Sequence, residues 1–144
     1  MSHEVRTLDV GDARAIEHCF EVFHELRPHL TPAEFARRVA VQSGEGYRIV
    51  SIERQGVVAA AAGYRTQHFL AWGRVLYVDD LVTRPGHTRR GLGGALIDWL
   101  IGEARREHCD ALHLDSGYAR HDAHRLYLDK GLRLACHHFA LKLN

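Results

Sequence analysis

A glycine-rich segment in the second half of the chain lies between a strand-like run and a helical pattern. Residues His87–Leu96 read His-Thr-Arg-Arg-Gly-Leu-Gly-Gly-Ala-Leu. Glycine lets the backbone approach a ligand closely, because no Cβ stands in the way. The first N–H groups of a helix have no partner within it, and the helix dipole adds about half a positive charge there. With the cations of Arg89 and Arg90 beside them, these groups predict a pyrophosphate-binding site.

Glycine runs alone are weak signals, and a flexible loop before a core helix is the alternative interpretation. A nucleotide P-loop ends in Gly-Lys-Ser/Thr, a pattern that the sequence lacks. A dinucleotide-binding fold places its glycines directly after the first strand of the domain. Here they come past the middle of the chain, after several strand-like runs. Neither nucleotide motif therefore fits.

Two adjacent carboxylates, Asp79 and Asp80, lie late in the strand-like run before this loop. Successive strand residues point to opposite faces, so only one of them can face a given cleft unless a bulge intervenes. A carboxylate can hold an ammonium group and accept its proton, directly or through water. The alternative is that both acids are solvated or paired with arginines. Their position in an otherwise apolar run favours a functional role.

The residues Val82–Leu96 resemble the acyl-CoA motif of the GCN5-related N-acetyltransferase (GNAT) superfamily. That motif is a strand, then Gln/Arg-x-x-Gly-x-Gly/Ala, then a helix. Gly91 and Gly93 match its two small positions, and Thr88 stands where Gln or Arg is usual. The backbone N–H groups of the motif need no particular side chain, so we expect the pyrophosphate contact to depend mainly on them.

A second stretch, Arg120–Leu132, is similar to the later motif of that family, Asn-x-x-Ala-x-x-Leu-Tyr-x-x-x-Gly-Phe. Arg120 replaces the usual Asn, and Leu132 replaces the usual Phe. The matching residues are Ala123, Leu126, Tyr127 and Gly131. Packing on the core is the alternative role for Tyr127.

The resemblance implies an N-acetyltransferase that uses acetyl-CoA as co-substrate and no metal, and in which a primary amine attacks the thioester directly. Asp79 or Asp80 would handle the ammonium proton, and Tyr127 would protonate the departing thiolate. Backbone N–H groups near Leu81 and Val82 would act as an oxyanion hole. The residues that the resemblance assigns to acetyl-CoA are Leu81, Val82, Thr83, Thr88, Arg89, Arg90, Gly91, Leu92, Gly93, Gly94, Ala95, Arg120 and Ala123. The alternative is a non-catalytic acyl-CoA-binding or interaction module with the same fold.

The elements that must position these residues follow from hydrophobic spacing, caps and turn residues. They predict one mixed α/β domain, 1–144, in the order β-α-α-β-β-β-α-β-α-β. The resemblance makes the sheet mostly antiparallel and flanked by helices, with acetyl-CoA between two splayed parallel strands. The expected strands are Val5–Val10, Tyr47–Arg54, Val57–Tyr64, Arg74–Thr83, Ala111–Asp115 and Arg133–Leu143. The expected helices are one from Asp12 to Pro28, Thr31–Gln42, Gly91–His108 and His121–Lys130.

The loop Arg65–Gly73 and the helices near the N-terminus are expected to choose the acceptor, but their residues indicate no particular amine. Small amines, polyamines, aminoglycosides and peptide N-termini all stay open as acceptors. The resemblance leaves a homodimer open as well.

The bulk composition indicates a cytoplasmic protein without nucleic-acid or membrane partners. Hydrophobic residues make up 46% and charged residues 26%, with a formal net charge of +1, which does not suit a dedicated nucleic-acid binder. No apolar run approaches the roughly 20 residues of a membrane helix, and no signal-peptide pattern is present. Three widely spaced cysteines form no disulfide framework. The 12 histidines show no metal-binding spacing.

Overall fold

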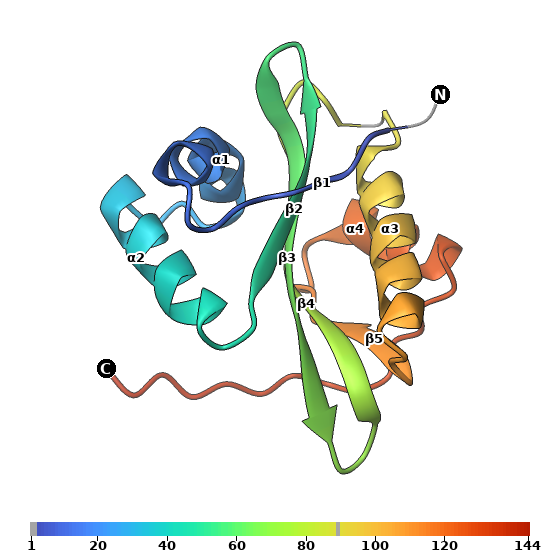
Figure 1. Ribbon diagram of the computed structural model, residues 1–144. Helices are drawn as coiled ribbons and strands as arrows, with labels where there is room; N and C mark the ends of the chain where they lie inside the picture. Colours follow the sequence, from blue (N-terminus) through green and yellow to red (C-terminus); the bar gives the residue numbers. More distant parts are fainter. Residues whose placement is uncertain (1–2, 89) are drawn as a thin grey trace. The chain divides into compact units, whose positions relative to one another are not determined.

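The computed structural model describes residues 3–88 and 90–144, which fall into two compact units, Met1–Leu114 and Asp115–Asn144 (Figure 1). The first unit contains a five-stranded sheet with three helices, and the second contains one short helix. That the chain is one domain remains a prediction. Among the described residues, no helix is both long and apolar enough to cross a membrane.

The sheet of the first unit follows the chain order of its strands. Neighbouring strands run antiparallel except for the last pair, which is parallel. Gln55 and Gly56 both have positive φ values, 54° and 78°, at the predicted tight turn of the first hairpin. The strands are β1 (Arg6–Thr7), β2 (Arg48–Arg54), β3 (Val57–Phe69), β4 (Gly73–Thr83) and β5 (Ala111–Leu114).

Helices cover both faces of this sheet. Figure 1 shows α1 (Ala13–Leu26) and α2 (Pro32–Ser43) on one face and α3 (Leu92–Arg106) on the other. The predicted caps form: Asp12 accepts from the backbone of the first turn of α1, and the Thr31 hydroxyl accepts from Glu34 N at 3.1 Å. This is the mixed, mostly antiparallel sheet flanked by helices that the sequence predicts.

The core lies between the sheet and these helices. Under α1 and α2, the buried cluster is aromatic in part, with the rings of Phe23 and Phe35 5.2 Å apart. A run of small residues, Ala59–Ala62, is fully buried in β3 and lets the helices pack closely. On the other face, Leu96 and Leu100 of α3 are fully buried. This packing fixes β4, which carries the candidate site residues.

One predicted loop is much shorter in the structure. Residues Arg65–Gly73 were expected as a loop, but β3 continues to Phe69 and β4 begins at Gly73. Only Leu70–Trp72 connect the two strands. The polar run after Tyr64 hides the strand in the sequence, whereas its backbone pairs with β4 residue by residue. Tertiary pairing outweighs local composition here.

In the second unit, α4 (His121–Asp129) ends as predicted, with Gly131 at a φ of 92°. The predicted strand Arg133–Leu143 is wrong, because this segment contains no strand. A strand forms only where its backbone pairs with a neighbour. The alternate apolar residues Phe139, Leu141 and Leu143 predict a strand by their spacing, but all three are exposed.

Candidate active site

A β-bulge in β4 brings the two candidate acids into one network. Gly63 pairs with Asp80 and Tyr64 pairs with Val78, so Asp79 is an extra residue with no partner opposite it on β3. Such an insertion breaks the strict alternation of side chains. Both acids therefore join one set of contacts, and which of them faces the acceptor stays a prediction.

Asp80 is held by residues from α1 and β2. Arg27, the C-cap residue of α1, donates from Nε to Asp80 Oδ1 at 3.0 Å. The Tyr47 hydroxyl donates to Asp80 Oδ2 at 2.7 Å. Arg27 also donates from Nη2 to the backbone oxygen of Asp79 at 3.1 Å. The end of α1 is thus tied to both the side chain and the backbone of the bulge.

Asp79 is held by a single arginine from the neighbouring strand. Arg65 donates from Nε to Oδ1 at 3.1 Å, and its Nη2 lies 2.9 Å from Oδ2. This is a bidentate pair, the strong geometry for a guanidinium and a carboxylate. Burial raises the pKa of the Asp79 carboxyl, and the bonds from Arg65 offset only part of that effect. A raised pKa makes Asp79 a stronger base.

Gly63 is the residue that makes room for this network. A Cβ at that position would lie 1.7 Å from the Tyr47 hydroxyl oxygen, far inside van der Waals contact. Burial first, and then the charge of Asp80, raise the pKa of the Tyr47 phenol well above its ordinary value. The phenol therefore stays protonated and serves as a donor to Asp80.

The parallel strands β4 and β5 part at the same place. Their pairing ends with Val78 opposite Leu114, while β4 continues along β3 as far as Thr83. Alternate residues after Val78 consequently point their backbone N–H and C=O groups away from β3, toward an edge that β5 does not cover. Leu81 and Val82, the predicted carbonyl-binding residues, lie in this part of β4.

The glycine-rich helix start has the geometry of an anion site. Gly91 is the N-cap of α3 with a left-handed φ of 78°, and no side chain caps the helix. The first backbone bond of α3 in this turn is Ala95 N to Gly91 O at 3.0 Å. The N–H groups of Leu92, Gly93 and Gly94 precede it, in the turn where helix donors lack partners. Backbone donors at a helix N-terminus are of the kind that binds phosphate groups.

The side chains of this loop divide into exposed and enclosed groups. Thr88 and Arg90 are exposed, and Arg89 lies outside the described residues. The His87 Nδ1 atom is enclosed and has no protein partner in the described part of the chain. An enclosed polar atom of this kind, in the loop that leads to the start of α3, is compatible with a polar ligand.

The remaining candidates lie in the second unit. Arg120 is the N-cap residue of α4, followed by Ala123 and then Tyr127, whose side chain is buried. Burial raises the pKa of the Tyr127 phenol, and Arg120 opposes that shift. The phenol is therefore protonated at neutral pH, as a proton donor must be.

Residues 13–132 match the acetyltransferase (GNAT) family. The chain belongs to that family. It is 30% identical over 112 residues to an uncharacterized N-acetyltransferase, YhdJ, of Bacillus subtilis, covering 77% of this chain and 79% of that protein. This confirms the family that the two sequence motifs indicate.

Solved structures of acetyltransferases have the same fold. A Trypanosoma brucei acetyltransferase superposes with a TM-score of 0.77 at 26% identity, over 97% of this chain and 99% of the other. An aminoglycoside N-acetyltransferase, AAC(6')-Iy, in complex with CoA superposes with a TM-score of 0.82 at 12% identity, over 96% and 93% of the two chains. The GNAT fold class is therefore confirmed.

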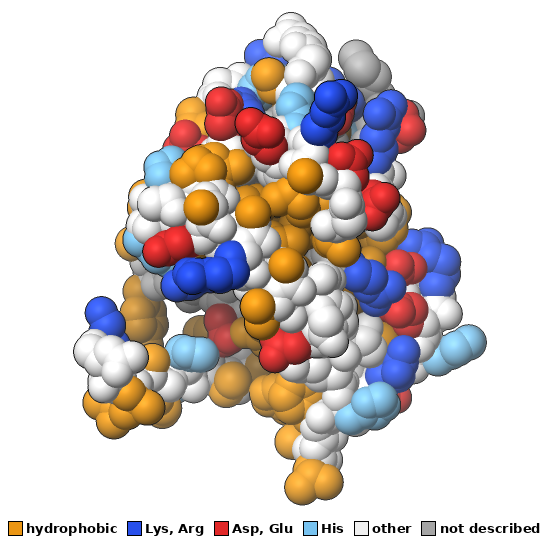
Figure 2. Space-filling model, turned by 60° about the vertical axis from the view of Figure 1, so that its left-hand side comes forward, with side chains coloured by type: hydrophobic (Ala, Val, Ile, Leu, Met, Phe, Trp, Pro, Cys, Tyr) orange, Lys and Arg blue, Asp and Glu red, His pale blue; other side chains and the backbone are white. Residues whose placement is uncertain are grey.

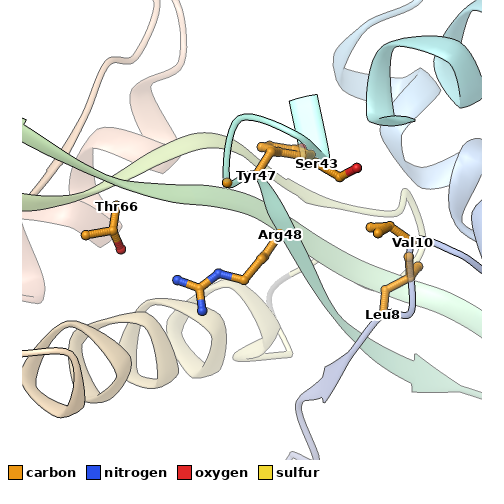
Figure 3. Close-up of a pocket in the computed structure, with 7 residues that line it drawn as sticks. Leu8, Val10, Ser43, Tyr47, Arg48 and Thr66 are labelled. Atoms are coloured by element: carbon orange, nitrogen blue, oxygen red, sulfur yellow. The ribbon is translucent and has the colours of Figure 1, made fainter. Parts of the chain in front are cut away.

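A separate hollow of about 410 Å³ lies near the start of β2 in this GNAT chain (Figure 3). It shares Tyr47 with the bulge network, although the Tyr47 hydroxyl is already bonded to Asp80. The Arg48 guanidinium, which also lines the hollow, is bound by Glu107 at 2.9 Å. The hollow thus offers little uncommitted chemistry. Its lining residues are Leu8, Val10, Ser43, Gly46, Tyr47, Arg48 and Thr66.

Four residues of the bulge network, Arg27, Tyr47, Gly63 and Arg65, do not follow from the family motifs. One signal in the sequence could have found Gly63, because a glycine inside a strand indicates a bulge or a close backbone approach. The arginines carry no such signal. Among the residues that the structure describes, no group of three or more His, Cys, Asp or Glu is placed to hold a metal ion.

We predict that Gly63→Ala destabilises the GNAT domain by about 1–3 kcal/mol, because the new Cβ collides with the Tyr47 hydroxyl. Gly102→Ala in α3 is the matched control. Its Cβ would meet only the flexible end of Arg106, at 3.3 Å, so a gain of about 0.5–1 kcal/mol in helix propensity should dominate. Denaturant unfolding of both variants measures the two effects. A Gly63→Ala protein as stable as the wild type would contradict this account of the network.

Proposed function

We propose that this protein is an acetyl-CoA-dependent N-acetyltransferase that moves an acetyl group to a primary amine by direct attack. The observation that carries the proposal is the arrangement along β4. This strand bears the two acids at its bulge, continues through Leu81–Thr83 without pairing to β5, and leads into the N-terminus of α3, which no side chain caps. Proton transfer, carbonyl binding and pyrophosphate binding are then served by consecutive segments of one chain.

Acetyl-CoA would supply an acetyl thioester, whose carbonyl carbon is the electrophile. The N–H groups of Leu92, Gly93 and Gly94 would bind its pyrophosphate, supported by Arg90 and by the side chain of Thr88. The enclosed Nδ1 of His87 would offer the ligand a further polar contact in this loop. Backbone N–H groups near Leu81 and Val82 would donate to the acetyl oxygen and stabilise the negative charge that develops there.

The two acids of the bulge would have different tasks. Asp80 is engaged on both oxygens, by Arg27 and Tyr47, and so is suited to hold the bulge in shape. Asp79 has the raised pKa and would accept the proton of the attacking amine, directly or through water. Tyr127 would donate a proton to the departing thiolate. We further propose a cytoplasmic location.

Turnover with an amine is the direct test of this function. We expect calorimetry to detect acetyl-CoA binding, and a thiol-release assay with an amine panel to detect free CoA with at least one acceptor. The panel should hold small amines, polyamines, aminoglycosides and peptides with a free N-terminus. Binding without release on any of these amines would instead favour the non-catalytic acyl-CoA-binding module.

Tyr127→Phe tests the general acid. The variant keeps the aromatic ring and loses the hydroxyl group that would donate the proton. We therefore predict a kcat lower by about tenfold or more, within the usual range for general acids. The calorimetric affinity for acetyl-CoA should stay close to that of the wild type. An unchanged kcat would remove Tyr127 from the mechanism.

A pair of isosteric variants separates the two acids. We predict that Asp79→Asn lowers kcat/KM by about 100-fold or more, because it removes the base. In the wild type the activity should fall as the pH drops through the raised pKa of Asp79, since only the ionised carboxylate accepts a proton. Asp80→Asn should mainly lower the melting temperature, because it weakens the bonds from Arg27 and Tyr47. A larger loss of kcat/KM in Asp80→Asn than in Asp79→Asn would reverse the assignment.

A further inference from the structure

The charges at the bulge balance one another. The carboxylates of Asp79 and Asp80 are each bound by one guanidinium, from Arg65 and Arg27 respectively. Glu45 adds a third carboxylate 3.7 Å from Arg65, but its side chain is 62% exposed and so is screened by water. The four side chains of Asp79, Asp80, Arg65 and Arg27 therefore carry no net formal charge. Over the face in Figure 2, acidic and basic side chains are likewise interspersed.

A positively charged acceptor finds both acids of the network already engaged. Arg27 and Tyr47 donate to the two oxygens of Asp80, and Arg65 occupies both oxygens of Asp79. The Asp80 and Asp79 side chains are only 14% and 23% exposed. A stable ion pair between an ammonium group and either acid would have to displace a guanidinium, whereas a single proton can still pass to Asp79 through a water molecule. An acceptor with several ammonium groups is at a disadvantage here, because no surplus negative charge attracts it.

Arg27 is the cation of the network that is turned toward solvent. Its side chain is 43% exposed, compared with 12% for Arg65. Its Nε and Nη2 atoms bind the bulge, while its Nη1 amino group has no partner among the residues that the structure describes. A guanidinium held in this way is pre-organised, because its planar fork is already fixed before a ligand arrives. The free edge is suited to an oxygen of a carboxylate or a phosphate.

We propose that Arg27 selects the acceptor, and that the preferred acceptor is a small amine that bears a carboxylate or phosphate a few bonds from its nitrogen. The Nη1 group of Arg27 would bind the acidic group, while the amine faces Asp79, whose backbone oxygen the same guanidinium already contacts. This inference rests on the proposed function. Among the possible acceptors, it disfavours polyamines and aminoglycosides, which carry several ammonium groups.

The test compares acceptors that differ only in the acidic group. The probes are 2-aminoethyl phosphate, ethanolamine and, as a dication, putrescine, each assayed for kcat/KM with acetyl-CoA. We expect the wild type to prefer 2-aminoethyl phosphate over ethanolamine by about tenfold or more, the effect of one charge-assisted hydrogen bond. Arg27→Gln should abolish that preference, and Arg27→Lys should keep part of it. The preference is the ratio of kcat/KM for 2-aminoethyl phosphate to kcat/KM for ethanolamine. A general effect of the substitution on Asp80 changes both values alike and so cancels in this ratio.

Arg38→Gln is the matched control, because Arg38 is an exposed arginine of α2. It removes the same charge and should leave the preference intact. The calorimetric affinity for acetyl-CoA should be equal in all of these proteins. A wild type that prefers ethanolamine or putrescine would overturn the proposal, as would a preference that Arg27→Gln leaves unchanged.

Calorimetry with 2-aminoethyl phosphate separates this inference from the proposed function. If none of the amines releases CoA, the proposed function fails, but binding can still be measured. Binding to the wild type that is lost in Arg27→Gln would support the role of Arg27. Equal binding to both proteins, or binding to neither, would refute it.

Discussion

The insertion of Asp79 into β4 is the constraint on which the site depends. It shifts the pairing with β3 by one residue, and this brings both acids into one network. The shift is compatible with the packing only because Gly63 has no Cβ where the Tyr47 hydroxyl lies. The pairing of β4 with β5 ends at Val78, the residue before the insertion. The bulge therefore begins directly after the point where β4 loses its pairing with β5.

Burying two neighbouring carboxylates is costly, and the surrounding residues compensate for it. Each acid loses water and lies beside a like charge, and both effects favour the neutral form. Two guanidiniums, Arg65 from β3 and Arg27 from the end of α1, favour the ionised form of the carboxylates and so oppose both effects. Removing one member of such a set leaves a buried charge without its partner, which costs more than the pair contributes. The four charges thus form one interdependent unit, and Arg27 links α1 to the sheet.

The parts of this structure that depend on nearby residues could be predicted from the sequence. The Thr31 cap, the turn at Gln55 and Gly56, and the glycine-rich start of α3 all form as expected. Arg27 was not predicted as a partner of Asp80, because 53 positions separate them and no local pattern joins them. The polar end of β3 has the composition of a loop, and only its pairing with β4 reveals the strand.

Along β4, backbone groups and side chains form two separate sets of polar groups. The two sets respond differently to changes in sequence. The helix start and the strand edge offer backbone N–H groups, which most residue types can supply. The aminoglycoside N-acetyltransferase AAC(6')-Iy has the same fold, with a TM-score of 0.82, at only 12% identity, so the backbone is alike although most side chains differ. The bulge network instead consists of side chains from α1, β2 and β3, each of which can change independently. Under the proposed function, acceptor choice would vary through residues such as Arg27 and Arg65, while the backbone that would bind the acyl donor stays the same.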